Sequence, residues 1–304
     1  MSEFNLMTPV VFIIFNRPDT TQQVFEEIRK ARPKKLFIIA DGHRPDKPGE
    51  AESCIAVRAI VEGVDWDCEV LKNYSDVNLG CGKRVATGLD WVFNTVEEAI
   101  ILEDDCIPHP TFFPFCQELL EKYRHDGRVL TISGNNFQFG HQRTDCSYYF
   151  SRYDHIWGWA TWRRMWKYYD FRMKLWPEVR DSRWLFDIFG SIQVESQQGK
   201  QCFKPYGVST IEYWHEIFED TYAGKIDTWD YQLLFACLVQ NGLHILPNTN
   251  LVSNIGFGQH ATHTPGLCKF ANMSVTGLEF PLKHPAFVIR DAWADEYTQV
   301  NNFS

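Results

Sequence analysis

The chain has 304 residues, of which 30 are Lys or Arg and 39 are Asp or Glu, so its formal net charge at neutral pH is −9. This acidic balance argues against nucleic acid as the main partner, because neutralising phosphates requires a basic face. Hydrophobic residues make up 44% of the chain, which excludes wholesale disorder and collagen-like order. The length suits one large α/β domain or a domain with a substantial appendage.

Two further features bear on the cellular compartment. No stretch approaches the roughly 20 uncharged apolar residues of a membrane span, and the segment Met1–Thr8 has neither the basic region nor the cleavage site of a secretory signal. The 9 cysteines are scattered and include no Cys-x-x-Cys pair, a pattern typical of reduced thiols. The sequence therefore predicts a cytoplasmic protein with no membrane span.

The first part of the chain alternates apolar runs with helical patterns. We expect strands at residues 9–15, 35–40, 68–71 and 99–102. We expect helices between them at residues 20–31, 50–62 and 83–94. The first run is continuously apolar, which is typical of a strand buried on both faces of a parallel sheet. Because parallel strands are joined by right-handed crossovers, this order predicts an α/β fold with a doubly wound, mostly parallel, Rossmann-like sheet.

The rest of the chain is rich in tryptophan. We expect helices at residues 111–123 and 231–240 and strands at residues 129–134 and 244–247. Trp157 or Trp159 could stack on the apolar face of a sugar ring. Trp162 and Trp166 are four residues apart, which predicts one buried helical stripe. The two arginines that follow Trp162 are expected on a solvated face, with contact to a phosphate or to the acceptor as the alternative.

Polar residues follow the apolar runs at the points where the expected strands end. These residues are Asn16 and Arg17, Asp41, the turn Gly80–Arg84, and the triplet Glu103-Asp104-Asp105. In a doubly wound sheet, ligands bind beyond the carboxyl ends of the strands. We therefore expect these groups to converge in space, although they are distant in sequence.

The acidic triplet calls for a compensating positive charge. Two like unit charges 4 Å apart repel by about 4 kcal/mol at an effective dielectric constant near 20. A hard divalent cation with oxygen ligands would relieve this repulsion and could bridge to a diphosphate. The alternative is a solvated acidic turn near a helix N-terminus. The position of the triplet at the end of a buried strand favours the cation site.

This pattern resembles that of the GT-A-fold nucleotide-sugar glycosyltransferases, over about residues 8–265. The triplet stands where that fold carries its Asp-x-Asp motif, and its form is similar to that of family 2 and N-acetylglucosaminyltransferase I-like enzymes. The resemblance implies a GT-A-like sheet with a C-terminal acceptor-binding part. Residues 1–135 would then form a nucleotide-sugar-binding half, and residues 136–304 the acceptor-binding and catalytic half of the same globular unit.

The resemblance also implies nucleotide-binding roles. The loop after the first strand would surround the base and ribose with Phe15, Asn16, Arg17 and Pro18. Asp41 matches the acid that hydrogen-bonds the base, and an ordinary turn is the alternative. Arg84 matches the basic residue that approaches the nucleotide or its phosphates, with Lys83 as a substitute and a surface helix position as the alternative. Asp104 would face the ribose and sugar.

A metal site is implied by the same resemblance. Asp105 would hold Mn²⁺ or Mg²⁺, and many members of the fold supply a late histidine to the metal or the diphosphate. His263 is the expected ligand because neutral imidazole suits Mn²⁺, with His260 as its rival and a surface histidine without a role as the alternative. Gly256 and Gly258 would let the loop that carries these histidines close over the donor.

Asp230 is the expected catalytic base. An inverting transfer needs a carboxylate that takes the proton of the acceptor hydroxyl. Apolar neighbours raise the proton affinity of such a group, and Asp230 lies between Trp229 and the apolar run that forms the expected helix. Asp227 is the rival, or it is the N-cap of that helix.

The function that we expect is that of a metal-dependent glycosyltransferase, with inversion favoured, that moves a sugar from a nucleoside diphosphate, preferably UDP, to a carbohydrate or other hydroxyl acceptor. A sugar nucleotidyltransferase is disfavoured because no Gly-rich basic loop follows the first strand. A non-catalytic carbohydrate- or nucleotide-binding protein on the same fold is the other alternative. The sequence leaves the base, sugar, acceptor, stereochemical outcome and oligomeric state open.

Overall fold

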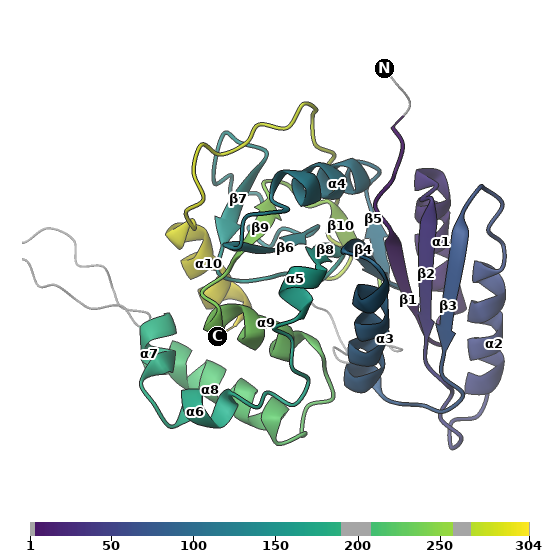
Figure 1. The fold of residues 1–304 in the computed structure, drawn as a ribbon, viewed down its shortest axis with the longest axis horizontal. Helices are drawn as coiled ribbons and strands as arrows, with labels where there is room; N and C mark the ends of the chain where they lie inside the picture. Colours follow the sequence, from purple (N-terminus) through teal and green to yellow (C-terminus); the bar gives the residue numbers. More distant parts are fainter. Residues whose placement is uncertain (1–3, 190–207, 258–268, 304) are drawn as a thin grey trace, which may run out of the picture.

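The computed structural model describes residues 4–189, 208–257 and 269–303. In chain order, its elements are β1 (Val10–Ile14), α1 (Pro18–Ala31), β2 (Lys35–Ala40), α2 (Glu50–Val61), β3 (Glu69–Tyr74), α3 (Cys81–Thr95), β4 (Glu98–Glu103), β5 (Cys106–Pro108), α4 (Phe112–Lys122), β6 (Val129–Ser133), β7 (Tyr148–Ser151), β8 (Trp159–Trp162), α5 (Arg163–Trp166), α6 (Trp176–Arg180), α7 (Trp184–Phe189), α8 (Val208–Tyr222), α9 (Asp230–Val239), β9 (Leu243–Pro247), β10 (Val252–Asn254) and α10 (Ala292–Asn302). Figure 1 shows their arrangement.

A central sheet of 8 strands organises the molecule, in the order β3-β2-β1-β4-β8-β6-β9-β7. β1 pairs in parallel with β2 and β4, and β2 pairs in parallel with β3. β8 and β7 run antiparallel to their neighbours. A separate pair, β5 and β10, lies beyond the end of β4. The predicted α/β class with a doubly wound, mostly parallel sheet is confirmed.

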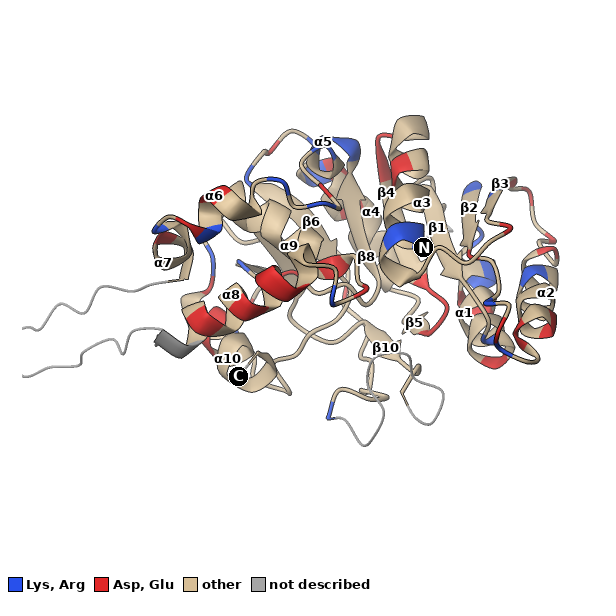
Figure 2. Cartoon of the chain, turned by 90° about the horizontal axis from the view of Figure 1, so that it is seen from below, with Lys and Arg blue, Asp and Glu red and all other residues tan. Residues whose placement is uncertain are grey.

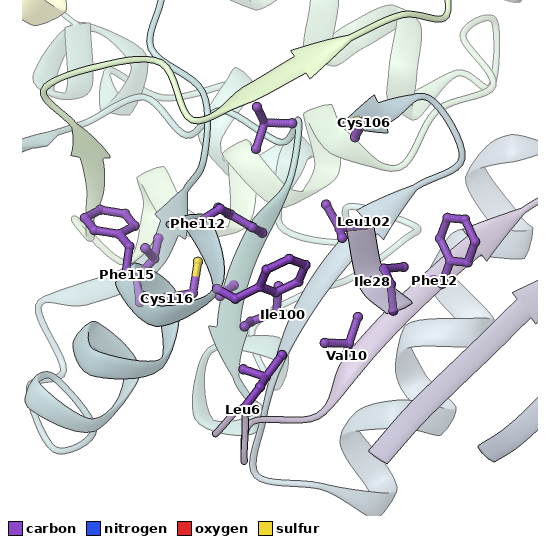
Figure 3. Packing of buried hydrophobic residues seen from close by; sticks show 14 of the residues in the cluster. Leu6, Val10, Phe12, Ile28, Ile100, Leu102, Cys106, Phe112, Phe115 and Cys116 are labelled. Carbon is purple, nitrogen blue, oxygen red and sulfur yellow. The ribbon is translucent and has the colours of Figure 1, made fainter. Parts of the chain in front are cut away.

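The sheet is covered on both faces, as the continuous apolar runs predict. All five residues of β1 are buried, and their side chains alternate between two cores. Val10 and Phe12 join the core beneath α1, α2 and α4, which Figure 3 shows with Ile28 and Phe112. Val11 packs with the helices of the opposite face, α3, α5 and α9. This double burial fixes the strand ends that carry the site.

Trp162 and Trp166 do not form the helical stripe that their spacing predicted. Trp162 is the last residue of strand β8, and its Nε1 donates to the Leu120 carbonyl at 3.2 Å. Trp166 ends the one-turn helix α5 and stacks on Tyr169 with ring centroids 4.2 Å apart. Both rings are buried, but they belong to different cores. A strand-to-helix junction between the two residues removes the helical relation.

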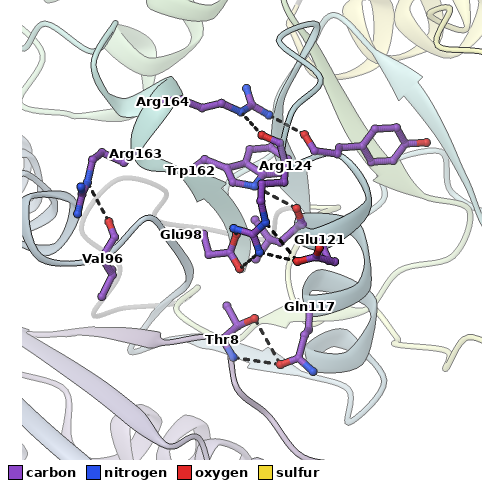
Figure 4. Close-up of polar contacts among 11 residues, drawn as sticks. Thr8, Val96, Glu98, Gln117, Glu121, Arg124, Trp162, Arg163 and Arg164 are labelled. Atoms are coloured by element: carbon purple, nitrogen blue, oxygen red, sulfur yellow. Dashed lines mark hydrogen bonds and ion pairs between the residues drawn. The ribbon is translucent and has the colours of Figure 1, made fainter.

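The two arginines that follow Trp162 hold backbone carbonyls and do not form the solvated face that we expected (Figure 4). The Arg163 Nε donates to the Val96 carbonyl at 3.2 Å. The Arg164 Nε donates to the Arg124 carbonyl at 3.0 Å, and its guanidinium lies 4.2 Å from the centre of the Trp162 ring. These contacts fasten α5 to the ends of α3 and α4, so neither arginine is free to bind phosphate.

The structure also bears on the cysteines and on membrane spans. The described cysteines are all free: Cys54, Cys68, Cys81, Cys106, Cys116, Cys146 and Cys237. Cys202 and Cys268 lie outside the described residues. Within residues 4–189, 208–257 and 269–303, no helix combines the length and apolar character that crossing a membrane requires. The cytoplasmic location stays a prediction.

A fully buried histidine lies on β9, on the face of the sheet opposite Ile245. The His244 Nδ1 is 2.7 Å from the Thr131 hydroxyl, and its Nε2 has no hydrogen-bond partner among the described residues. Burial, and to a smaller extent the charge of His155, lower the pKa of His244 to about 3. The folded protein therefore holds this imidazole neutral.

This histidine should make stability depend on pH. Its folded pKa lies below the ordinary value near 6.5, so its stabilising contribution is present above that value and is lost as the pH falls. For a single group, the loss between pH 7 and pH 5 is about 2 kcal/mol. Urea unfolding of His244→Gln should therefore show a pH 7-to-5 decrease in free energy of unfolding that is about 2 kcal/mol smaller than in the wild type. His43→Gln, at an exposed position, is the control, and an equal change in both variants would contradict the assignment.

Candidate functional site

The predicted strand-end residues lie at the carboxyl edge of the parallel strands. Glu103 is the last residue of β4, Arg17 precedes α1 by one residue, and Asp41 follows β2 directly. Acidic residues lie near β5 and along α8 (Figure 2). Two clusters form at this edge: one around Arg17 and the acidic triplet, and the other around Asp41 and Arg84.

Arg17 provides the positive charge nearest to the triplet. Its guanidinium pairs with Asp104 and, through Nη1, with the Asp105 Oδ2 at 2.9 Å. The Asp104 Oδ2 also accepts a hydrogen bond from the Phe15 backbone N–H at 3.2 Å. Burial alone would lower the pKa of Arg17, but the charges of Asp104 and Asp105 raise it overall. The sequence predicted these residues to converge and did not predict that they pair directly.

One arginine does not neutralise the whole triplet. Burial raises the pKa of Glu103, and the charges of Asp105 and Asp104 raise it further. Burial also raises the pKa of Asp104, although Arg17 opposes that rise. The charge of Asp230 makes a smaller contribution in the same direction to the pKa of Glu103. Arg17 alone therefore does not offset the burial of these acids and the repulsion among them.

Asp41 organises the turn that leads into α3. Its carboxylate accepts hydrogen bonds from the backbone N–H groups of Gly42 at 2.9 Å, Leu79 at 3.0 Å and Gly80 at 3.1 Å. The Asn78 side-chain amide donates to the same carboxylate at 3.1 Å. Burial raises the pKa of Asp41 above its usual value, although these backbone donors oppose the rise. The contacts of Asp41 are thus those of a residue that stabilises a turn, which was the alternative interpretation. A hydrogen bond between Asp41 and a nucleotide base stays a prediction.

Arg84 is buried, which excludes the surface-helix alternative. Its Nε donates to the Ala40 carbonyl at 3.1 Å, and its Nη2 donates to the Asn73 carbonyl at 2.6 Å. These contacts join the ends of β2 and β3. Lys83, the substitute, is exposed. The Arg84 guanidinium thus already donates to backbone carbonyls, and a contact between Arg84 and a phosphate stays a prediction.

The loop after β1 is fixed by an acid that the sequence reasoning missed. The Asn16 Nδ2 donates to the Glu50 Oε1 at 2.9 Å, and Glu50 also pairs with Arg44. The Arg44 guanidinium lies 5.6 Å from the centre of the Phe15 ring. Glu50 is buried at the start of α2, where an acid is favourable, so its place after a polar loop was the available signal.

Asp230 begins α9 beside a stack of aromatic rings. Its Oδ1 accepts hydrogen bonds from the Tyr231 backbone N–H at 2.9 Å and from the Thr228 hydroxyl. The preceding Trp229 stacks on Trp159 with ring centroids 5.5 Å apart. Trp159 is only 1% exposed, so its ring packs against Trp229 and has no free face on which a sugar could stack.

The loop between β7 and β8 brings Trp157 and a second acid toward the site. Trp157 is partly exposed, and its ring lies 5.5 Å from that of Phe257. In the same loop, the Asp154 Oδ2 is buried and has no hydrogen-bond partner among the described residues. Burial and then the charge of Asp230 raise the pKa of Asp154 to about 8. Nothing in the local sequence marks this acid, because its neighbour Asp230 is distant in the chain.

Asp227 does not cap α9. The N-cap of α9 is Trp229, which makes no side-chain capping hydrogen bond. The Asp227 carboxylate instead accepts hydrogen bonds from the backbone N–H groups of Cys81 at 3.0 Å and Gly82 at 2.9 Å, at the start of α3. The prediction that Asp227 is the N-cap of α9 is therefore wrong. The sequence contains one signal for this contact. The first residues of α3 are Cys-Gly-Lys after a glycine, so the helix has no capping side chain of its own.

The residues that the structure describes do not form a complete metal site, and the metal stays a prediction. In the part of the chain that the structure describes, no three His, Cys, Asp or Glu residues form a group that could hold a metal ion. Mg²⁺ is usually held by one or two carboxylates together with substrate phosphates. Asp105 offers a carboxylate whose Oδ1 accepts a hydrogen bond from the Cys106 thiol at 3.4 Å. His263, with its rival His260 and with Gly258, lies outside the described residues.

Gly256 lies directly against the acidic triplet. A Cβ at this position would be 2.0 Å from the Asp105 Oδ2 and 2.7 Å from the Arg17 Nη1. The backbone N–H of Ile255 donates to the Asp105 carbonyl at 2.9 Å. A side chain at this position would displace the paired Asp105 and Arg17 side chains, whereas closure of this loop over a donor stays a prediction.

No family model matches this chain, and no curated protein matches it. Among solved structures, it is similar to a UDP-glucose pyrophosphorylase complexed with UDP-glucose, at 12% identity and a TM-score of 0.30, over 53% of this chain and 78% of that one. It is also similar to residues 1–349 of TarS from S. aureus, at 11% identity and a TM-score of 0.36, over 53% of this chain and 48% of that one. HddC from Yersinia pseudotuberculosis shows 9% identity and a TM-score of 0.32, over 52% and 78%. TM-scores this low establish no shared function.

Proposed function

We propose that this protein is a glycosyltransferase that moves a sugar from a nucleoside diphosphate, preferably UDP, to a hydroxyl group of a carbohydrate or other acceptor. One observation carries the proposal. At the carboxyl edge of the sheet, Arg17 pairs with Asp104 and Asp105, and hydrogen bonds of Asp227 to the start of α3 bring the segment that leads to Asp230, from the other half of the chain, to the same edge. Such a site combines groups for a phosphorylated donor with a separate carboxylate for the acceptor.

Asp230 is the proposed base. It takes the proton of the acceptor hydroxyl while that oxygen attacks the anomeric carbon of the donor, and the electron pair of the breaking C–O bond leaves with the diphosphate. The Thr228 hydroxyl and the Tyr231 N–H orient the carboxylate through its Oδ1, which leaves Oδ2 for the acceptor. Attack opposite to the leaving group inverts the anomeric centre.

The donor would bind at the ends of β1 and β4. Phe15, Asn16 and Arg17 are proposed to surround the base and ribose, and Asp104 to face the sugar. Asp105 would hold Mn²⁺ or Mg²⁺, with His263 as the proposed second protein ligand. When bound, the ion would supply positive charge that neutralises the departing diphosphate. Repulsion from Asp105 and Asp104, which contributes to the raised pKa of Glu103, supports this role.

Thermal unfolding with a panel of nucleoside diphosphates tests donor binding. We expect UDP together with Mn²⁺ to raise the melting temperature most, because a ligand at 100 times its Kd stabilises the folded state by about 2.7 kcal/mol. Asp105→Asn should remove the part of the shift that needs Mn²⁺. An equally large shift without metal would refute the role of Asp105, and no shift with any diphosphate would refute the proposed function. A larger shift with a nucleoside triphosphate, together with release of pyrophosphate from that triphosphate when a sugar 1-phosphate is added, would identify a nucleotidyltransferase instead.

A further inference from the structure

The segment that precedes Asp230 is fastened to the first turn of α3. Asp227 accepts hydrogen bonds there from the N–H groups of Cys81 and Gly82, across 146 and 145 positions of sequence. These N–H groups belong to the first turn of a helix, where no intrahelical carbonyl is available to them. The N-cap residue of α3, Gly80, has no side chain that could serve them. An acid from the other half of the chain therefore completes this helix.

Two glycines make room for this contact. A Cβ at Gly82 would lie 2.4 Å from the Thr228 carbonyl oxygen, and a Cβ at Gly80 would lie 2.6 Å from the Asp227 Oδ2. Gly80 also has a φ of +82°, a conformation that glycine adopts without strain. A side chain at residue 82 would push the Thr228 backbone away from α3, and one at residue 80 would displace the Asp227 carboxylate. The close approach is thus built into both sides of the contact.

The contact links the cluster around Asp41 and Arg84 to the proposed base through a short series of hydrogen bonds. On one side, the Gly80 N–H donates to Asp41 at the end of β2. On the other side, Thr228 follows Asp227, and its hydroxyl donates to Asp230. The buried Gln232 side chain donates to the Thr228 carbonyl at 2.8 Å, which fixes the same residue from within α9. A displacement of Asp227 would therefore reach Asp230 through one intervening residue.

We propose that Asp227 is a positioning residue that holds Asp230 at the distance and angle from the donor that proton transfer requires. This inference rests on the proposed function, because it assumes that Asp230 is the base. Asp227 acts through Thr228 and α3 and does not contact the reacting atoms. The contact then affects the rate of transfer and leaves donor affinity unchanged.

Steady-state kinetics of Asp227→Ala and Asp227→Asn test the proposal. A displacement of about 1 Å in a reacting group can cost 10²-fold in rate, so we expect kcat to fall about 10- to 100-fold in the alanine variant. The asparagine variant keeps one acceptor oxygen and should lose less. The KM values for donor and acceptor should stay within about twofold of the wild type. Gly82→Ala, which leaves Asp227 intact, should lower kcat in the same way by displacing Thr228.

Asp291→Ala is the matched control for a purely structural role. Asp291 caps α10 by accepting a hydrogen bond from the Ala294 N–H at 2.9 Å, so its loss also removes a helix cap. If Asp227→Ala and Gly82→Ala lower kcat no more than this control does, Asp227 only stabilises α3 and the proposal is overturned. Transfer that survives Asp230→Asn would instead exclude Asp230 as the base, on which the positioning role rests, and the absence of transfer by the wild type would refute the proposed function. Wild-type kcat in Asp227→Ala beside an inactive Asp230→Asn would overturn the positioning role alone.

Discussion

Asp230→Asn should bind the nucleotide donor as the wild type does and transfer sugar at least about a hundredfold more slowly, because general base catalysis typically contributes 10²- to 10⁴-fold. The amide has the shape of the carboxylate but cannot take up the acceptor proton. Its oxygen can still accept hydrogen bonds from Thr228 and from the Tyr231 N–H, so the start of α9 should keep its structure. Single-turnover transfer measured together with calorimetric donor affinity separates the two steps.

The control for this variant is Glu178→Gln, which removes an exposed acid from the first turn of α6. We expect it to keep the transfer rate of the wild type. Full activity of Asp230→Asn would exclude Asp230 as the base. A variant that loses donor affinity and transfer together would place Asp230 among the donor contacts. Only retained donor binding with lost transfer supports the assignment.

Local patterns predicted the parallel strands β1 to β4 well because each of them is decided by its own residues. The run 35–40 is apolar after Lys35, and β2 occupies these positions with its last five residues buried. The start of α3 was predicted two residues late, at residue 83 where the helix begins at Cys81. The reason is physical, since its first N–H groups are satisfied by Asp227, and no window of sequence around residue 81 contains that acid.

The same distinction applies to the candidate site. The strand ends predicted which residues would meet at one edge of the sheet, and Arg17, Asp104 and Asp105 do meet there. Spacing could not predict that Arg17 would pair with both acids, because pairing depends on side-chain direction in two separate loops. Asp154 was not predicted as a site residue for a related reason, because only the fold brings it near enough to Asp230 for that charge to raise its pKa.

Arg17→Ala is expected to lower the free energy of unfolding by about 3 kcal/mol at pH 8, because removing one partner of a buried ion pair leaves an uncompensated charge. Asp104 is 3% exposed and Asp105 is 13% exposed, so neither carboxylate can turn to water without rearrangement. Arg17 itself is 23% exposed, which places the effect at the low end of the usual range. Urea unfolding at constant temperature measures the change. Arg29→Ala breaks a pair of similar geometry with Asp65 at an exposed site and should change stability little.

The pH dependence of this defect distinguishes lost charge from lost packing. Burial raises the pKa of Asp104, and Arg17 is the group that opposes the rise, so its removal should raise that pKa further. A carboxyl whose folded pKa lies above its unfolded value loses stabilising free energy as the pH rises through the folded pKa. The defect of Arg17→Ala should therefore shrink as the pH falls from 8 to 5, because the unpaired acids take up protons in the folded state. A defect that is equal at both pH values would mean that the Arg17 side chain stabilises the fold through its packing, and that the triplet does not depend on it for charge.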